Sequence, residues 1–372
     1  MKITYSVVCA FAAALVMWYG AAAAGEIPAL VRVPVDSVGF ALTAAQVEAV
    51  VAVSDSMIAA GLPDADQSRA PDGGPLLGAI VPHDDYIYAG PFYVTALRDV
   101  RAPLVVMFGV CHKARRIGLE GKLVFDDFDA WKGPYGYMPV SPLRERVIEL
   151  LPEDIVLVSG ELHAGEHSLE SLVPFLQYPG FPGAGKDRRI LPVLVTRQPG
   201  ELYLRSVEAM ASALSRVFAE EGLEWGRDVA IVISADCVHY GDEEWGGRNY
   251  APFGADQAGY ERAVAQDIDI ARTALAGPVT MEKIRLFRER VENDDLEWPY
   301  KVTWCGVYSI PFGLGVIERL AALDGRESPT GVILGYGTSL GPGPLPVEQT
   351  GLGRTAINTL HHWVGYVSIG YR

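Results

Sequence analysis

The chain alternates short apolar runs with longer segments of helical periodicity. The apolar runs have the length and composition of buried strands, and they occupy residues 76–82, 103–109, 155–158, 189–195, 229–234 and 331–336. Between them lie segments with helical spacing, at residues 43–60, 142–151, 201–221, 255–276 and 281–291. This alternation predicts an α/β fold with a central mixed, largely parallel sheet that is flanked by helices.

A few segments interrupt this alternation. Residues 123–137 are aromatic and contain glycine, so we interpret them as a hairpin outside the main pattern. Residues 180–187 and 341–353 have the composition of loops. Because no internal repeat and no low-complexity linker follows residue 25, we expect residues 25–372 to form one domain.

The first 24 residues differ from the rest. Lys2 is their only charge, residues 7–18 are apolar, and four alanines precede Gly25. A basic start, a short apolar stretch and a small-residue cleavage site are typical of a secretory signal peptide. The alternative is an uncleaved membrane anchor, although the apolar run is short for one. We therefore expect removal of residues 1–24 and a periplasmic or secreted protein, with no membrane association after cleavage.

Charge and cysteine content narrow the class of partner. Cleavage leaves 30 basic residues against 46 acidic ones, a net charge of −16. An acidic chain without a basic stripe is not expected to bind nucleic acid or an anionic membrane. Three cysteines remain, Cys111, Cys237 and Cys305, too few for a disulfide scaffold. An odd number in an oxidising compartment implies at least one free or metal-bound thiol.

Polar, chemically capable residues follow several predicted strands. His83 comes directly after residues 76–82, Cys111 and His112 follow residues 103–109, and Asp236 and His239 follow residues 229–234. Ligands of open α/β sheets bind in the crevice at the carboxyl ends of the strands. We therefore expect these side chains to converge on one edge of the sheet.

Histidine is a common metal ligand, and most of the seven histidines lie in polar or glycine-flanked loops. Those five are His83, His112, His163, His167 and His239. The other two, at 361 and 362, precede an aromatic terminal strand and are interpreted as structural. No CxxC or HExxH spacing is present, so local motifs alone do not identify a metal site.

Six sequence blocks, in order, resemble the MEMO family, also called AmmeMemoRadiSam system protein B. The most distinctive block is Glu-His-Ser-Leu-Glu at residues 166–170, which leads into Leu-Val-Pro-Phe-Leu. The other blocks are Val-Pro-His-Asp-Asp-Tyr at 81–86, Gly-Val-Cys-His at 109–112, Ser-Ala-Asp-Cys-Val-His-Tyr-Gly at 234–241, Cys-Gly at 305–306 and Val-Gly-Tyr-Val-Ser-Ile at 364–369. Together they cover most of the chain after residue 75.

This resemblance implies the fold of class III extradiol ring-cleavage dioxygenases, in which two histidines and a carboxylate hold non-haem Fe(II). In the MEMO family a cysteine takes the place of the carboxylate, and the metal is iron or copper. By that resemblance His83, His112 and Cys305 are the metal ligands. Asp236 and His239 carry over as pocket residues, and His239 matches the acid/base histidine of the dioxygenases. His167 carries over only as a pocket-wall or second-shell residue.

Chemical properties of these side chains support part of that assignment. Two imidazoles and a thiolate leave open positions on Fe, Cu or Zn, and the thiolate favours Cu(I) and Zn over the Fe(II) ring-cleavage route. His239 could transfer a proton near neutral pH, with Asp236 as its catalytic partner. For Asp236, helix capping after the strand is an equal alternative.

The sequence also departs from the family. Asp84 and Asp85 replace an Ala-Gly pair, either as solvated loop charges or as extra ligands or acid/base groups. Export differs from the intracellular setting of most relatives. In an oxidising compartment Cys111 and Cys237, beside the predicted site, could form a disulfide that leaves Cys305 free.

Several functions remain open at this point. The leading hypothesis is an exported metalloprotein for Fe or Cu that carries out non-haem oxidative or redox chemistry. The alternatives are a non-catalytic metal- or peptide-binding protein and a zinc-dependent hydrolase. Whether the partner is a small molecule or a peptide is not specified by any residue pattern.

Overall fold

The structure is a computed structural model that describes residues 28–66, 74–185, 187–293, 295, 298–341 and 343–372. The predicted signal peptide lies outside these residues. The strands are β1 (Val31–Arg32), β2 (Gly78–Val81), β3 (Leu104–Val110), β4 (Leu123–Phe125), β5 (Ala130–Gly133), β6 (Gly136–Pro139), β7 (Val156–Val158), β8 (Arg189–Val195), β9 (Val229–Ser234), β10 (His239–Gly241), β11 (Gly277–Pro278), β12 (Thr330–Thr338) and β13 (His362–Tyr371). The α-helices are α1 (Ala44–Ala60), α2 (Tyr86–Leu97), α3 (Leu143–Leu150), α4 (Gly160–Ala164), α5 (Val173–Gln177), α6 (Leu202–Glu221), α7 (Gln257–Ile270), α8 (Met281–Val291) and α9 (Ser309–Leu323).

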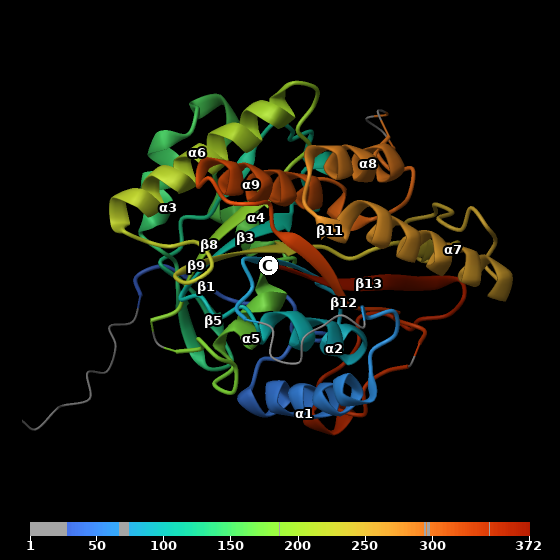
Figure 1. Cartoon of the computed structure of the whole chain (residues 1–372). Coiled ribbons are helices and arrows are strands. Elements are labelled where there is room, and N and C mark those ends of the chain that lie inside the picture. The colour runs from blue at the N-terminus through green and yellow to red at the C-terminus, as the bar shows by residue number, and fades with distance from the viewer. Residues whose placement is uncertain (1–27, 67–73, 186, 294, 296–297, 342) are drawn as a thin grey trace, which may run out of the picture.

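A large mixed sheet forms the centre of the molecule, with the order β11-β12-β13-β2-β9-β3-β8-β4-β7. Its middle strands β2, β9, β3 and β8 are parallel, because crossover helices connect them. The flanking pairs β13–β2 and β4–β8 are antiparallel. Helices α3, α6, α8 and α9 cover one face, and α1, α2 and α5 cover the other (Figure 1). The predicted α/β class with a central mixed sheet is confirmed.

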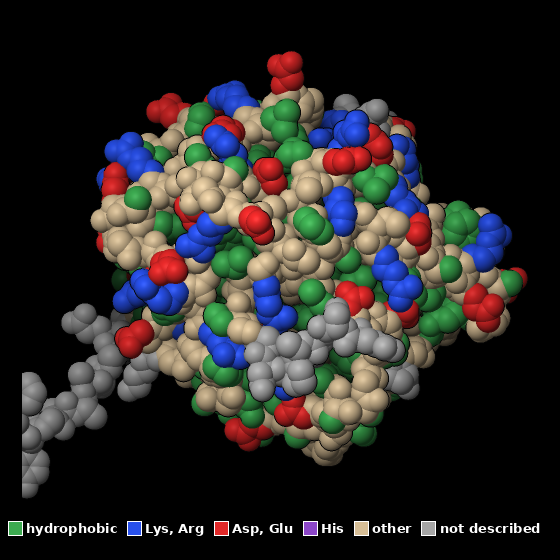
Figure 2. Space-filling model, in the orientation of Figure 1, with side chains coloured by type: hydrophobic (Ala, Val, Ile, Leu, Met, Phe, Trp, Pro, Cys, Tyr) green, Lys and Arg blue, Asp and Glu red, His purple; other side chains and the backbone are tan. Residues whose placement is uncertain are grey.

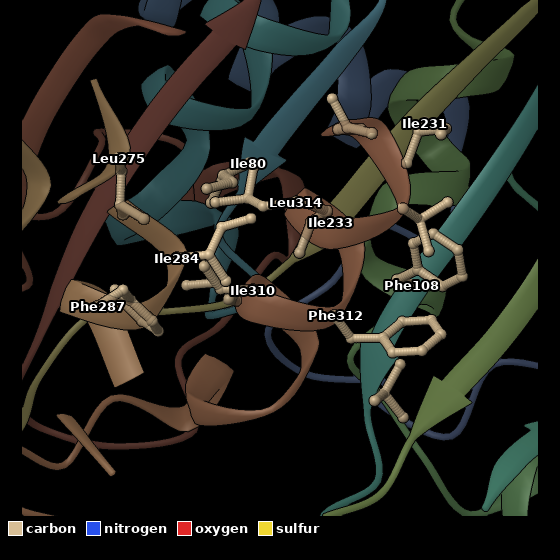
Figure 3. Packing of buried hydrophobic residues seen from close by; sticks show 14 of the residues in the cluster. Ile80, Phe108, Ile231, Ile233, Leu275, Ile284, Phe287, Ile310, Phe312 and Leu314 are labelled. Atoms are coloured by element: carbon tan, nitrogen blue, oxygen red, sulfur yellow. The ribbon is translucent and has the colours of Figure 1, made fainter. Parts of the chain in front are cut away.

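The apolar strands bury side chains on both faces, which is why they lack the alternation of a half-exposed sheet. Ile80, Phe108 and Ile233 belong to the cluster beneath α9, as Figure 3 shows. Their neighbours Val81 and Met107 point the other way, into the cluster beneath α1 and α2. Each central strand therefore connects two cores and is held rigidly.

Two predicted segments differ from the structure. The prediction of a hairpin for residues 123–137 is wrong at its start, because β4 joins the main sheet between β8 and β7. Only β5 and β6 form the expected hairpin, which pairs with β1 in a small separate sheet. The predicted helix 255–276 ends in a π-helical turn, Ala271–Leu275, after α7.

The face in Figure 2 carries basic and acidic side chains intermixed rather than a basic stripe. Among the described helices, none combines the length and apolar character that a membrane crossing requires.

Candidate metal centre

The three histidine-bearing segments meet at the carboxyl ends of three adjacent parallel strands. His83 lies two residues beyond β2, His112 two beyond β3, and Asp236 two beyond β9. Strand β9 pairs with both β2 and β3, and Val81 stands opposite Ser234, so the strand ends are level. The convergence predicted from strand order is confirmed.

His83 is the centre of the cluster and is buried. Its Nδ1 lies 3.0 Å from the Ser234 hydroxyl, which donates its single proton to the Ser168 carbonyl. The hydroxyl must therefore accept the Nδ1 proton, and this leaves the lone pair on Nε2. Nε2 lies 3.3 Å from Cys305 Sγ and 3.4 Å from Asp236 Oδ2. Burial lowers the pKa of His83 to about 3, so its imidazole is neutral at pH 7.

His112 is oriented by Glu166, a residue to which the sequence assigned no role. Glu166 Oε1 accepts from His112 Nδ1 at 2.8 Å, and Oε2 accepts from the His112 backbone N–H, also at 2.8 Å. The lone pair of His112 is thereby placed on Nε2. Enclosure by protein lowers the pKa of His112, but the charge and hydrogen bond of Glu166 outweigh it and raise that pKa. Burial likewise raises the pKa of Glu166, yet His112 and His167 hold it well below its usual range.

His167 contributes a third imidazole. Its ring stacks on His112 with centroids 4.7 Å apart and lies 5.5 Å from the ring of His83. Burial and the neighbouring His112 lower its pKa to about 4, so it is neutral at pH 7. The resemblance gave His167 only a pocket-wall or second-shell role, and the structure places it within reach of a shared ion.

Two groups of possible ligands overlap at His83. One comprises His83, His112 and His167, and the other comprises His83, Asp236 and Cys305, with ligand atoms within 4.8 Å of one another in each group. The predicted set of His83, His112 and Cys305 takes His112 from the first group and Cys305 from the second. It remains a prediction, and His83 is the member common to all three sets.

Cys305 begins the short 3-10 helix Cys305–Val307 that precedes α9. Its sulfur accepts the backbone N–H of Asp236 at 3.0 Å, a donor that would also stabilise a thiolate. Burial raises the pKa of the thiol well above its ordinary value. Binding a metal here requires loss of that proton.

Asp236 does not cap a helix, because strand β10 follows it, so the capping alternative is wrong. Its Oδ1 accepts the backbone N–H of His83 at 2.8 Å. Its Oδ2 lies 3.8 Å from Nε2 of His239, which is too far for a hydrogen bond. That His239 nitrogen is buried and has no hydrogen-bond partner among the described residues. It is therefore available to a ligand in the adjacent cavity.

Asp84 and Asp85 are not solvated loop charges. Asp84 accepts a 2.5 Å hydrogen bond from the Tyr366 hydroxyl, and burial raises its pKa to about 6. Asp85 accepts from the backbone N–H of Thr355 at 2.6 Å and from its hydroxyl. A Cβ at Gly39 would lie 1.9 Å from Asp85 Oδ1, so a larger residue there would displace the Asp85 carboxylate. Asp85 thus fixes the loop around Thr355 to the strand end.

The cluster lines two cavities. One, here called the acidic pocket, has a volume of about 570 Å³ and includes His83, Asp84, Asp85, Asp236 and His239. The other, here called the arginine pocket, has a volume of about 450 Å³ and includes His112, Cys305, Arg115 and Arg197. The candidate ligands are therefore reached from two cavities of different chemistry.

Other histidines and cysteines have separate positions. His163 is buried and bonds the Val124 carbonyl through Nε2 at 2.9 Å, so it is structural. His362, interpreted from sequence as structural, lines the acidic pocket and stacks on Trp245. Cys111, Cys237 and Cys305 are all free, so the hypothesised disulfide between Cys111 and Cys237 is absent.

Together these features define an α/β protein with imidazoles, a thiolate precursor and carboxylates gathered at the strand ends. Its residues 67–339 match the family described as Memo-like protein, so the chain belongs to the Memo-like family. Its fold is the extradiol-dioxygenase-like fold expected from the sequence blocks.

Comparison with individual proteins supports the same family. The chain is 30% identical over 211 residues to a MEMO1 family protein of Aeropyrum pernix, covering 55% of this chain and 69% of the relative. It is 34% identical over 167 residues to one of Methanosarcina barkeri, covering 44% and 55%. For one of Methanococcoides burtonii the identity is 31% over 170 residues, covering 45% of this chain and 57% of the relative. The chain thus spans little more than half the length of several curated relatives that it matches.

Proposed function

We propose that this chain is an exported metalloprotein that holds Fe or Cu through His83, His112 and Cys305. Zn is the other metal that these ligands accept. The observation that carries the proposal is the environment of His83 Nε2. Its lone pair faces Cys305 Sγ at 3.3 Å and Asp236 Oδ2 at 3.4 Å, while its Nδ1 proton is committed to Ser234.

The surroundings fit a cation better than an empty site. A lone pair and a carboxylate oxygen repel each other at short distance unless a proton or a metal ion lies between them. Both imidazoles have an acceptor at Nδ1, Ser234 for His83 and Glu166 for His112, which is the usual arrangement behind metal-ligating histidines. His167 and Asp236 stand beside the site and complete its polar wall.

A bound metal would supply a Lewis-acidic or redox centre with open coordination positions. The protein's own contribution lies in the acidic pocket. There the buried, unpartnered Nε2 of His239 can accept or return a proton of a bound ligand. Asp236 holds the His83 loop through its backbone N–H and keeps a negative charge near His239. Burial raises the pKa of Asp236, but His83 and His239 outweigh it and lower that pKa to about 2.

The test of the metal site is metal analysis of the anaerobically purified protein beside His83→Ala, His112→Ala and Cys305→Ala. We expect near-stoichiometric metal in the wild type and strong loss in each variant. Matched controls are Cys111→Ala and His361→Ala, which remove the same side-chain types outside the proposed ligand set. Wild-type stoichiometry in all three ligand variants would disprove the site.

Turnover separates the chemical alternatives. Dioxygen uptake with catechols supports oxidative chemistry, whereas tight Cu(I) binding without turnover supports a non-catalytic metal- or peptide-binding protein. Ester or amide hydrolysis with Zn and not with Fe supports a hydrolase. Export is tested separately by sequencing the mature N-terminus, which we expect to begin at Gly25.

A further inference from the structure

The arginine pocket lies between the end of β3, the end of β8 and the segment that leads into α9. Arg115 and Arg197 contribute guanidinium groups, and Tyr300 and Tyr308 contribute aromatic walls. His112 and Cys305 line the same cavity. It encloses about 450 Å³, within the size range of small-molecule sites.

Both arginines have guanidinium N–H donors without an acceptor among the described residues. The Arg115 side chain makes no hydrogen bond or ion pair with any residue that the structure describes. Among the described residues, the Arg197 guanidinium contacts only the carboxylate of Glu120, at 3.3 Å through one terminal nitrogen, and that carboxylate is half-exposed. The Nε of Arg197 is buried and has no hydrogen-bond partner among the described residues. A buried guanidinium nitrogen without an acceptor is costly, and an anionic ligand would satisfy it.

The positive field of both arginines reaches the aromatic wall. Burial raises the pKa of Tyr300 to about 12, and Arg115 opposes that shift. Burial also raises the pKa of Tyr308, and both Arg197 and Arg115 oppose that shift. Both hydroxyls therefore stay neutral donors at pH 7. Much of the remaining wall is apolar, with side chains such as Val110, Leu119, Val195 and Val307. Thr196 and Glu120, the carboxylate that pairs with Arg197, also line the cavity.

We propose that the arginine pocket binds a small organic acid, with its carboxylate held by Arg115 and Arg197 and its apolar body against Tyr300 and Tyr308. Planar guanidinium groups match carboxylates through paired hydrogen bonds. The apolar wall favours an organic acid over an inorganic anion. The acid lies beside His112 and Cys305, so it is adjacent to the metal centre if the proposed function holds. Binding itself does not depend on the metal.

The test uses benzoate as the probe and metal-stripped full-length protein, with affinity measured by isothermal titration calorimetry. We expect saturable binding of benzoate and none of benzyl alcohol, which lacks the charge. Arg115→Gln and Arg197→Gln should each weaken binding about 10- to 100-fold, the range for loss of a charge-assisted hydrogen bond. Arg285→Gln, which removes the same charge from the groove beside α8, should leave the affinity unchanged.

Thermal unfolding checks that each variant remains folded. No benzoate binding to the folded wild type, or equal binding by the arginine variants, would overturn the proposal. Binding of inorganic phosphate without benzoate would overturn the assignment to a carboxylate. Because benzoate binding is measured on metal-stripped protein, its result does not depend on the metal site. Benzoate binding therefore tests the arginine pocket, metal analysis tests the proposed function, and either proposal can be disproved while the other stands.

Discussion

The acidic pocket and the arginine pocket are lined by different members of one cluster of candidate ligands. Their other lining residues differ in charge and in the loops that supply them. Aspartates and histidines line the first, with no lysine or arginine among its described residues. The second has two arginines against one glutamate. The first is bounded by residues 35–40 and 355–364, whereas the ends of β3 and β8 bound the second. Both cavities are built around one fixed set of strand ends. The sheet therefore positions the candidate ligands, and the surrounding loops determine the charge of each cavity.

This difference predicts different chemistry in the two cavities. Carboxylates and neutral imidazoles can hold cations and exchange protons, and burial raises the pKa of Asp84 to about 6 and that of Asp85 to about 7. Arginine stays charged at any physiological pH, so the other cavity holds a permanent positive charge. We therefore expect metal and proton chemistry to respond to changes that leave anion binding unaffected, and the converse.

The largest expected effect outside the ligands themselves comes from Glu166→Gln. The amide keeps one acceptor oxygen but loses the charge that orients and raises the basicity of His112. Loss of such a partner typically weakens metal binding 10- to 100-fold. Competition with a chelator of known affinity measures it, with the exposed Glu161→Gln as control. Unchanged metal affinity would show that His112 is not a ligand, while benzoate binding should remain at the wild-type value.

A second comparison uses pH. With the proposed ligands, metal binding displaces the Cys305 proton, so the apparent metal affinity should rise at least tenfold per pH unit between pH 6 and 8. The raised pKa of His112 means that a second proton is also displaced, which steepens the profile at the lower end of this range. Benzoate affinity should stay constant over that range, because benzoate is ionised and arginine does not titrate. Cys305→Ala should flatten the metal profile by about one proton. An equally steep profile in that variant would remove Cys305 from the ligand set.

The smallest expected effect comes from Thr355→Val. It removes one hydroxyl hydrogen bond to Asp85 and keeps the backbone N–H that also binds this carboxylate. We expect a loss of about 1 kcal/mol in the free energy of unfolding. Denaturant unfolding measures this loss. The benzoate affinity of the arginine pocket should not change, and if it did, the two cavities would not be independent.

Strand order and binary pattern predicted most of the architecture, because the central strands are buried on both faces and are uniformly apolar. Helix α2 was not predicted. Its residues are buried on all sides, since it lies between α1 and the sheet, and it contains Pro91, so it lacks an amphipathic pattern. Strand β4 was missed because three residues beside a glycine- and aromatic-rich hairpin carry no period of their own.

Strand-end logic alone brought His83 and His112 together, and only the family resemblance added Cys305. Neither could identify Glu166 or Ser234 as the acceptors behind the imidazoles, because such a role depends on which ring nitrogen faces which loop. The arginine pocket was also not predicted. Arg115 and Arg197 follow different strands, and their convergence becomes visible only in three dimensions.

We propose that one metal centre at His83 lies between the acidic pocket and the arginine pocket, and anomalous diffraction from crystals of the metal-loaded protein would locate it. The predicted result is one anomalous peak within bonding distance of His83 Nε2 and Cys305 Sγ, with His112 as the third protein ligand. A peak held by His112 and His167 without Cys305, or no peak near His83, would contradict it.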